Sequence, residues 1–335
     1  MTTDDVLNSL SCQEYDDAVL LDALQVKGEA QRKLFELASS IRHQNFPNDM
    51  VQVRSVIEVS NVCGQKCKYC AIGSKNQRLN FTLDYASIVD IINFLWIKGR
   101  RNILLQSGEN RNEEFVENVA HAITEAMVLH NDLRIILCMG DLSRTQYRML
   151  HEAGATDYIL KFETSNPELF SFCKPNDTLE HRLECICQLK EEGFRIGSGN
   201  IVGLPGQSLT DLVADLRLIQ ALPLSMNSAT IFVPAENSAF SDKPAGSPIW
   251  TLNMMALMRI MNPCRLMPTT SSLEKMIDDG QYLGLLAGAN TITIHDGTPE
   301  DLQQHFPIYS AKRVRPQRAH FAEILKRAHL NSDIF

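Results

Sequence analysis

The sequence predicts an α/β fold: a (β/α)8 barrel of the TIM type with a helical extension before it. Strand-like apolar runs alternate with helix-length amphipathic segments along most of the chain, which is typical of βαβ units. Eight strands close such a barrel, and ~250 residues plus an extension fit the length of 335 residues. The eight strand candidates are 51–60, 102–106, 133–138, 156–161, 195–202, 228–233, 265–268 and 290–294.

Helix start signals stand between several of these strands. In a capping box the first residue and the residue three positions later exchange hydrogen bonds with each other's backbone. Pairs with this spacing are Ser143 with Gln146, Asp177 with Glu180, and Ser208 with Asp211. Each pair predicts a helix that begins directly after a turn.

The N-terminal segment is predicted to be mostly helical. Its leucines and isoleucine recur at helical spacing, at Leu20, Leu21, Leu24, Leu34, Leu37 and Ile41. We therefore predict a helical extension over 1–45 that caps one end of the barrel. The barrel is predicted over 46–310, and a C-terminal helical segment over 311–335.

Composition excludes several classes of protein. The net charge of −8 argues against a nucleic-acid partner, because a protein that binds nucleic acid needs a clustered basic surface. The basic stretch 312–327 is interpreted as a solvated helix face. No apolar run reaches the ~18 residues that span a bilayer, and the start of the chain is acidic. Nine cysteines without paired spacing fit a reducing compartment. We expect a cytoplasmic protein without a membrane partner.

The first strand is followed by Cys63, Cys67 and Cys70, in the spacing C-x3-C-x2-C. Three thiolates on one short loop can ligate three irons of a cubane and leave the fourth iron open to another chelator. The alternative is a zinc knuckle, but structural zinc needs four ligands, usually in two pairs, and the sequence has no second pair. The spacing therefore predicts a 4Fe-4S cluster as the metal centre.

This motif resembles that of radical S-adenosylmethionine (SAM) enzymes, in which the amino and carboxylate groups of SAM chelate the open iron. Further segments are similar to the biotin synthase-like branch of that family, and most similar to [FeFe]-hydrogenase maturases of the HydE type. These segments are 57–63, 105–109, 163–167, 202–207, 268–270 and 287–290. The resemblance implies a complete barrel in which SAM is reductively cleaved at the cluster, giving a 5'-deoxyadenosyl radical that acts on a small substrate.

The resemblance also implies a set of SAM contacts at the C-terminal ends of the strands, where barrels build their active sites. The residues implied are Tyr69, Gln106, Ser107, Gly108, Glu109, Lys161, Glu163, Arg182, Val202 and Leu204. Arg182 suits a carboxylate, because its planar fork donates two parallel hydrogen bonds. Without the family context, Glu109 fits a solvated turn, and Glu163 and Arg182 fit surface ion pairs.

Substrate contacts are expected from hydroxyl and imidazole groups near the last strands. The candidates are Thr269, Thr270, Thr293, His295 and Tyr309, although a lone histidine at a strand end is more often structural.

The chain departs from the maturases at three points. Lys161 replaces a planar arginine fork by a point charge, residues 293–296 do not match the maturase pattern, and no cysteine follows Cys264 to bind a second cluster. The substrate pocket is therefore expected to differ.

The other cysteines are interpreted as packing residues. They are Cys12, Cys138, Cys173, Cys185, Cys187 and Cys264. Cys185 and Cys187, two apart on a predicted helix, should point in different directions. Biotin synthase forms a second cluster from cysteines inside its barrel, and only Cys138 matches that arrangement here.

Three functions remain open at this point. The first is a HydE-like maturase or a paralogue with an altered substrate. The second is C–S bond formation of the biotin or lipoate type, or a rearrangement as in methylornithine synthase. The third is a non-catalytic iron-sulfur scaffold. Both enzymatic functions imply a small-molecule substrate and an external electron donor such as flavodoxin or ferredoxin.

Overall fold

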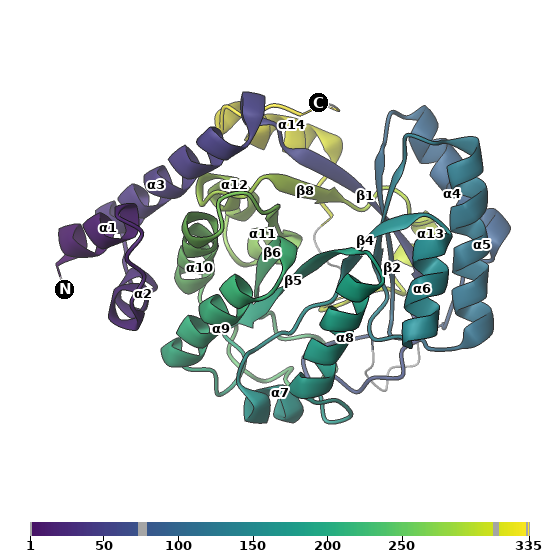
Figure 1. The fold of residues 1–335 in the computed structure, drawn as a ribbon, viewed down its shortest axis with the longest axis horizontal. Coiled ribbons are helices and arrows are strands. Elements are labelled where there is room, and N and C mark those ends of the chain that lie inside the picture. Colours follow the sequence, from purple (N-terminus) through teal and green to yellow (C-terminus); the bar gives the residue numbers. More distant parts are fainter. Residues whose placement is uncertain (1, 73–78, 311–314, 333, 335) are drawn as a thin grey trace.

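The computed structural model describes residues 2–72, 79–310, 315–332 and 334, and it forms a barrel of parallel strands inside a layer of helices (Figure 1). The sheet order is β6-β5-β4-β3-β2-β1-β8-β7, and every paired neighbour runs parallel. This confirms the predicted fold class. The strands are β1 (Gln52–Ser60), β2 (Asn102–Ser107), β3 (Arg134–Cys138), β4 (Ala155–Ile159), β5 (Arg195–Val202), β6 (Leu224–Ile231), β7 (Pro268–Thr269) and β8 (Thr291–Ile294).

The barrel closes between β6 and the short strand β7. Leu266, just before β7, forms a parallel bridge with Met226. Its N–H donates to the Ser225 carbonyl at 3.0 Å, and its carbonyl accepts from the Asn227 N–H at 2.9 Å. The strand predicted at 228–233 in fact begins at Leu224, because polar residues such as Asn227 are buried inside the barrel and hide the apolar pattern.

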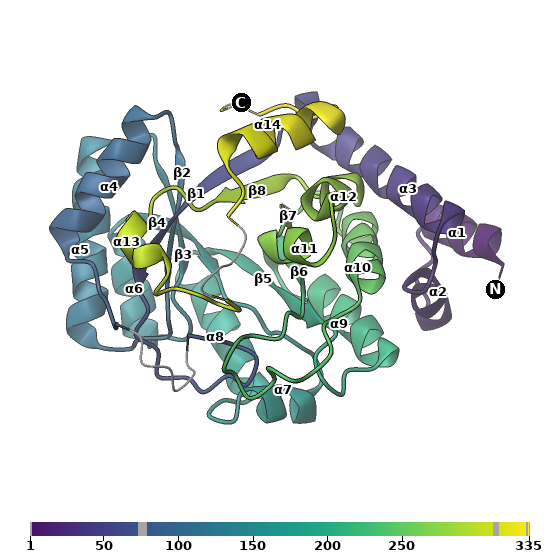
Figure 2. The same ribbon diagram turned by 180° about the vertical axis from the view of Figure 1, so that it is seen from behind.

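Helices cover the outside of the barrel in the order of a βα repeat (Figure 2). They are α4 (Tyr85–Ile97), α5 (Glu113–Leu129), α6 (Arg144–Glu152), α7 (Pro167–Cys173), α8 (Leu179–Glu191), α9 (Leu209–Ala221), α10 (Pro248–Met261), α11 (Ser271–Met276), α12 (Gly280–Leu286), α13 (Glu300–Gln303) and α14 (Arg318–Arg327). No helix in the described ranges is both long and apolar enough to cross a membrane.

Two of the three predicted capping boxes are confirmed. Ser143 with Gln146 caps α6, and Ser208 with Asp211 caps α9. The prediction for Asp177 is wrong, since Thr178 caps α8 and its hydroxyl accepts from the backbone N–H of His181 at 3.2 Å. The Asp177 carboxylate is instead buried beside Arg182, where it forms an ion pair with the guanidinium and does not cap the helix.

The N-terminal helices lie along the outer layer of the barrel. They are α1 (Thr3–Ser11), α2 (Asp17–Ala23) and α3 (Glu29–Asn45), and a single 3-10 turn, η1 (Pro47–Asp49), leads from them into β1. Helix α3 runs beside α10 and α12 (Figures 1 and 2). Helix α10 is buried on all sides from Thr251 to Met261, because the barrel covers one face and the extension covers the other.

One buried amide holds this extension to the barrel. The Asn253 side chain on α10 donates to the carbonyls of Leu24 and Val26, both at 3.0 Å, and accepts from Gln31 at 2.7 Å. All three partners belong to the segment around α2 and α3. Asn253 is therefore one of the buried polar contacts that hold the extension, together with Arg42 on α3, which donates to the carbonyls of Leu285 and Ala289.

We predict that Asn253→Ala lowers the free energy of unfolding by about 1–3 kcal/mol, because it leaves two carbonyls without their donor. Hydrogen exchange should quicken first in residues 17–45, and urea unfolding gives the stability. Asn45→Ala, at an exposed site on the same extension, is the control. Equal effects of both substitutions would contradict the assignment.

Candidate active site

The C-terminal ends of the strands surround a cavity of about 440 Å³. Most of the predicted site residues line it, although they come from segments far apart in the sequence. They are Cys63, Cys67, Tyr69, Cys70, Gln106, Ser107, Gly108, Glu109, Lys161, Glu163, Arg182, Thr269, Thr270, Thr293, His295 and Tyr309. The barrel thus brings the cysteine motif, the SAM-contact candidates and the substrate candidates to one space.

Two predicted residues do not line this cavity. The side chain of Val202 is buried in the main core, and Leu204 lies in a smaller apolar cluster against which Tyr69 packs. On the same strand Ile201 lines the cavity instead, because successive side chains of a strand point to opposite sides. On this strand the side chain of Ile201, and not that of Val202, is therefore in a position to contact a ligand in the cavity.

Backbone hydrogen bonds from four separate segments hold the cysteine loop. Gly64 N–H donates to the Glu109 carbonyl at 2.9 Å, and Lys68 N–H donates to the Cys173 carbonyl at 2.9 Å. Ala71 N–H donates to the Ile308 carbonyl at 2.7 Å. The base of the loop is held by Asn61, whose amide donates to the carbonyls of Leu79 and His305, both at 2.9 Å. The loop is therefore fixed by its surroundings and not by its own secondary structure.

A close approach of two backbones places the loop after β2 against the cysteines. A Cβ atom on Gly108 would lie 2.7 Å from the Cβ of Cys63 and closer still to the Val62 carbonyl oxygen. No side chain fits there, so only glycine allows 107–109 to pack on the cysteine loop. Gly140 has a similar role, since a Cβ there would lie 2.5 Å from the Cγ of Glu109.

The three thiols of the loop fit the ligand set of an iron-sulfur cluster. All three are half-buried, and they line the cavity. Burial raises the pKa of Cys63, and it raises the pKa of Cys67 well above its ordinary value, with the neighbouring Cys70 thiol adding to the shift. Such thiols become thiolates when a metal coordinates them. Three thiols from one loop that line the same cavity match a cluster with one open iron.

A buried guanidinium organises the opposite wall. The Arg182 side chain is only 4% exposed, and its nitrogens lie 2.8 Å from Asp141, 2.9 Å from Asp177 and 3.5 Å from Glu109. Burial opposes its charge, but Asp141 and Glu109 together raise the pKa of Arg182. Lys174 supplies a second buried cation, 3.1 Å from Asp177 and 3.9 Å from Glu109.

The acids of this cluster are not equivalent. Burial raises the pKa of Asp141 to about 6, with Arg182 opposing the shift and Asp177 adding to it. Burial also raises the pKa of Asp177. Glu109 accepts a hydrogen bond from the Gln65 amide and has its carboxylate at the edge of the cavity. Glu109, Lys174 and Arg182 are thus the members of the cluster that line the cavity, while Asp141 and Asp177 do not.

Strand β4 is followed by a strained turn that aims Glu163 into the cavity. Glu163 has φ of 64°, a left-handed conformation that is costly for a residue with a side chain. Two hydrogen bonds to β5 hold it, from Glu163 N–H to the Gly199 carbonyl at 3.0 Å and from Ile201 N–H to the Glu163 carbonyl at 2.8 Å. Its carboxylate pairs with Lys161 at 2.9 Å, and Lys161 also donates to the Thr230 hydroxyl at 3.3 Å.

The substrate candidates differ in the hydrogen bonds and ion pairs that they form within the protein. The Thr269 hydroxyl donates to the Gln281 carbonyl at 2.9 Å, and the Thr270 hydroxyl shares a hydrogen bond with Ser272. His295 lies with Nδ1 3.4 Å from the buried Glu58 carboxylate. A carboxylate beside Nδ1 orients the imidazole, so that its other nitrogen can serve a ligand.

Only some of the remaining cysteines are packing residues, as was expected for all of them. Cys173 and Cys185 are buried, and Cys138 lines the cavity, where burial raises its pKa to about 11. Cys12, Cys187 and Cys264 are exposed, so the expectation is wrong for these three. Each lies at the surface because its helix or loop turns that position away from the barrel.

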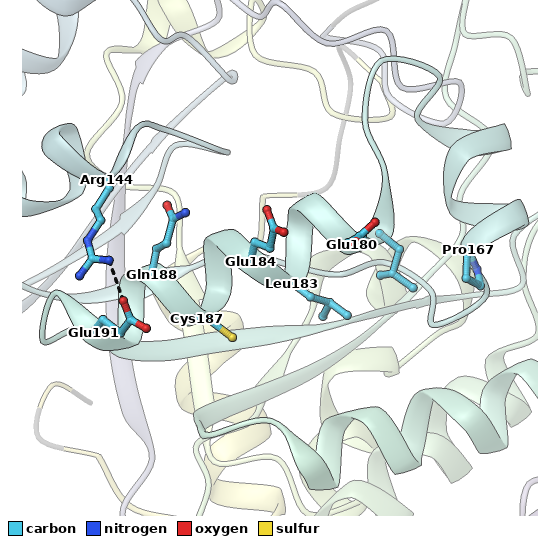
Figure 3. A pocket seen from close by; sticks show the side chains of 9 residues that line it. Arg144, Pro167, Glu180, Leu183, Glu184, Cys187, Gln188 and Glu191 are labelled. Atoms are coloured by element: carbon cyan, nitrogen blue, oxygen red, sulfur yellow. Dashed lines mark ion pairs between the residues drawn. The ribbon is translucent and has the colours of Figure 1, made fainter.

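A second depression lies on the outer surface of α8 (Figure 3). Figure 3 shows its side chains, among them Glu180, Glu184 and Cys187, spaced along one face of the helix. They do not converge on a point as the residues of the barrel cavity do. The cavity at the strand ends is therefore the candidate active site.

Sequence reasoning missed several residues of this site. Gln65 stands inside the cysteine motif and binds Glu109, so its position was a usable signal. Lys174 and Asp141 lie in loops without a recognisable pattern, and the pattern at Asp177 is that of a helix cap, so only the fold shows that these residues gather around Arg182.

Known proteins share both the fold and the motif. Residues 57–219 match the model of the Radical SAM superfamily. The chain is 32% identical to the [FeFe] hydrogenase maturase subunit HydE of Thermotoga maritima over 314 residues, which cover 93% of this chain and 89% of the relative. The chain therefore belongs to the radical SAM superfamily. It is a radical SAM enzyme, and the cofactors of this family are a 4Fe-4S cluster and SAM.

Other relatives are more distant. The biotin synthase of Cronobacter sakazakii is 26% identical over 269 residues, covering 77% of this chain and 75% of the relative. The crystal structure of the methylornithine synthase PylB matches with a TM-score of 0.82 at 21% identity, covering 97% of this chain and 95% of that one. The hydrogenase maturase HydG matches with a TM-score of 0.82 at 16% identity, covering 100% and 77%. These two structures share the barrel fold with this chain.

We predict that Gly108→Ala displaces the cysteine loop, because the added Cβ would overlap Val62 and Cys63. Iron and sulfide bound per chain after anaerobic reconstitution should fall by more than about half, a loss expected when a ligand loop moves by even 1 Å. Gly64→Ala is the matched control, since a Cβ there would meet its nearest atom at 3.7 Å. Normal iron content in the Gly108 variant would refute the close-approach argument.

Proposed function

We propose that Cys63, Cys67 and Cys70 hold the cluster and that the adjoining charged wall holds SAM. The observation that carries this proposal is the meeting of three thiols with Glu109 and Arg182 around one cavity. A ligand with an ammonium and a carboxylate group fits between a carboxylate and a guanidinium. We further propose that the substrate is a small molecule related to that of HydE, on the basis of similarity over most of both chains.

When bound, the cluster and SAM supply an electron and a carbon-centred radical, and the protein supplies position and protection. Glu109 accepts from the ammonium group of SAM, and Arg182 donates to its carboxylate. Asp141 and Asp177 keep the guanidinium charged and oriented while no ligand is present. Glu163, fixed by its backbone, is placed for the hydroxyls of the ribose.

Three loops close the cavity and restrict water. The loop after β6 meets the segment after β8 through the Glu236 N–H, which donates to the Tyr309 carbonyl at 2.9 Å. The segment after β8 in turn meets the cysteine loop at Ala71 and Ile308. Apolar side chains such as Ile72 and Phe232 complete the wall. Exclusion of water protects a radical from unwanted hydrogen transfer.

The deeper part of the cavity is proposed to bind the substrate. It offers one cation, Lys161, with the hydroxyl of Thr230 and the side chains of Thr293, His295 and Tyr309. Lys161 stands where the maturases have arginine, so a bidentate contact becomes a single point charge. We propose a HydE-like enzyme in which the substrate differs in the group that this residue meets.

The alternative of a biotin synthase-type second cluster has little support. Beyond the three loop cysteines, Cys138 alone adds a thiol to the described lining of the cavity. One thiol does not hold a second cluster. The electron donor is proposed to be a flavodoxin or ferredoxin, which are acidic proteins suited to the exposed Lys66 and the partly exposed Lys68 on the cysteine loop.

We predict that Glu109→Gln weakens SAM binding by about 10- to 100-fold, because it removes the charge from one strong hydrogen bond. Equilibrium binding to the reconstituted protein measures the change. Glu113→Gln, at an exposed position of α5, is the control. Unchanged SAM affinity in the Glu109 variant would remove this residue from the proposed site. Arg182→Ala is less informative, since it also leaves Asp141 and Asp177 buried without their cation, at a cost of about 3–5 kcal/mol in stability.

The substrate is tested by complementing a strain that lacks its HydE maturase, while 5'-deoxyadenosine release is measured on purified protein. We predict intact SAM cleavage with incomplete restoration of hydrogenase activity, because Lys161 alters the pocket. Lys161→Arg should then increase restoration. Cys67→Ala, which removes one cluster ligand, should abolish both readouts. Full restoration by the unchanged chain would show a plain maturase, and absence of SAM cleavage would support an iron-sulfur scaffold.

A further inference from the structure

A second group of metal-ligating side chains lies behind the charged wall, outside the cavity. His181 and Cys185 stand four residues apart on α8 and so share one face of the helix. The Nε2 atom of His181 lies 3.7 Å from the Cys185 sulfur and 3.9 Å from a carboxylate oxygen of Asp141. All three ligand atoms lie within 4.8 Å of one another.

We propose that Asp141, His181 and Cys185 form a mononuclear site for a divalent cation of the zinc class. Nitrogen, sulfur and one carboxylate oxygen are the donors that zinc prefers, and three protein ligands with one open position are common in its sites. Tetrahedral bonds of zinc to these donors set the ligand atoms about 3.3–3.6 Å apart. The observed separations reach that geometry with small side-chain rotations.

The state of Asp141 is the independent observation in favour of a cation. Its side chain is fully buried, and neither oxygen accepts a hydrogen bond from any residue that the structure describes. Arg182 forms an ion pair with one oxygen, at 2.8 Å, while the other oxygen lies 3.6 Å from Arg111 and 3.9 Å from His181. Buried carboxylate oxygens normally have hydrogen-bond partners or coordinate a metal.

The surroundings supply the outer contacts that a metal site needs. The Tyr147 hydroxyl hydrogen-bonds the Cys185 thiol and accepts from the Leu142 N–H at 3.0 Å. Arg182 fixes the orientation of Asp141. Such outer partners hold ligands in place for a metal. The repulsion between a cation and the guanidinium groups of Arg182 and Arg111 is offset by Glu109, which pairs with both, and by Asp177, which pairs with Arg182.

Access is provided by His181, whose side chain is 46% exposed. An ion can enter from solvent, and a water molecule can take the fourth position. The bound ion would join the start of α8 to the loop between β3 and α6, and so stiffen the support of Arg182. The site uses none of the cluster cysteines, so this proposal stands or falls independently of the proposed function.

Zinc binding to the reconstituted holoenzyme tests the proposal, with equilibrium dialysis and elemental analysis as readouts. The unchanged chain should bind one zinc ion in addition to its iron. His181→Ala and Cys185→Ala should each weaken zinc binding by at least about 100-fold, the upper range seen for loss of an outer partner alone. Iron content should stay the same in both variants.

Cys187→Ala is the matched control, because this cysteine lies on the same helix but faces outward (Figure 3). It should bind zinc like the unchanged chain. His181 is partly exposed, so its removal should leave the fold intact, which circular dichroism checks.

A second experiment uses the chain with Cys63, Cys67 and Cys70 replaced by alanine. Added Co²⁺ should show the charge-transfer absorption of a thiolate ligand, and this absorption should disappear on Cys185→Ala. Zinc affinity equal in the His181 variant and the unchanged chain, or no zinc binding at all, overturns the proposal.

Discussion

The active-site end of this barrel depends on one buried cation, the guanidinium of Arg182. It joins three loops that the barrel alone would leave separate: the loop after β2 through Glu109, the loop after β3 through Asp141, and the turn before α8 through Asp177. If one buried charge is removed, its partners are left buried and unpaired, which lowers stability. The complete set is stable because each charge is paired. The position of Glu109, and with it the wall of the cavity, follows from this pairing.

The cysteine loop depends on that wall in turn. Gly64 donates to the carbonyl of Glu109, and Gly108 lets the two backbones touch. A cluster ligand loop without secondary structure must be held from outside, because its thiols keep a fixed spacing only if the backbone does. The charge network and the metal ligands are therefore parts of one support, with backbone contacts passing from one to the other.

Much of this could be predicted from the sequence, for physical reasons that differ between elements. Strand β1 is buried along nearly its whole length and carries the β-branched residues Val53, Val56, Ile57 and Val59, while the cysteine spacing is a local signal that needs no fold. Strand β6 was predicted four residues late, because buried Asn227 looks like a loop residue.

Three-dimensional neighbours were beyond sequence reasoning. Asp177 has the spacing of a helix cap, yet the nearby Arg182 and Lys174 attract its carboxylate more strongly than a helix end does. Strand alternation places the side chain of Ile201 toward the cavity, whereas the resemblance implied Val202, in a segment whose backbone approaches the ligand. Lys174 and Gln65 enter the site only through the pairing of loops.

The two ends of the cavity are built on different principles, and this bears on how such an enzyme can change its substrate. The end near the cysteines consists of interlocked charges, so that a substitution at Glu109 or Arg182 disturbs several partners at once. The deeper end has separate polar groups, and its one cation, Lys161, is tied only to Glu163 and Thr230. An exchange at this end changes which group of the ligand finds a hydrogen-bond partner, and it leaves the charge network intact. A wrong ligand leaves a buried polar group of the protein unpaired, so the site discriminates strongly against that ligand. Divergence from a maturase is therefore least costly at Lys161 and around His295.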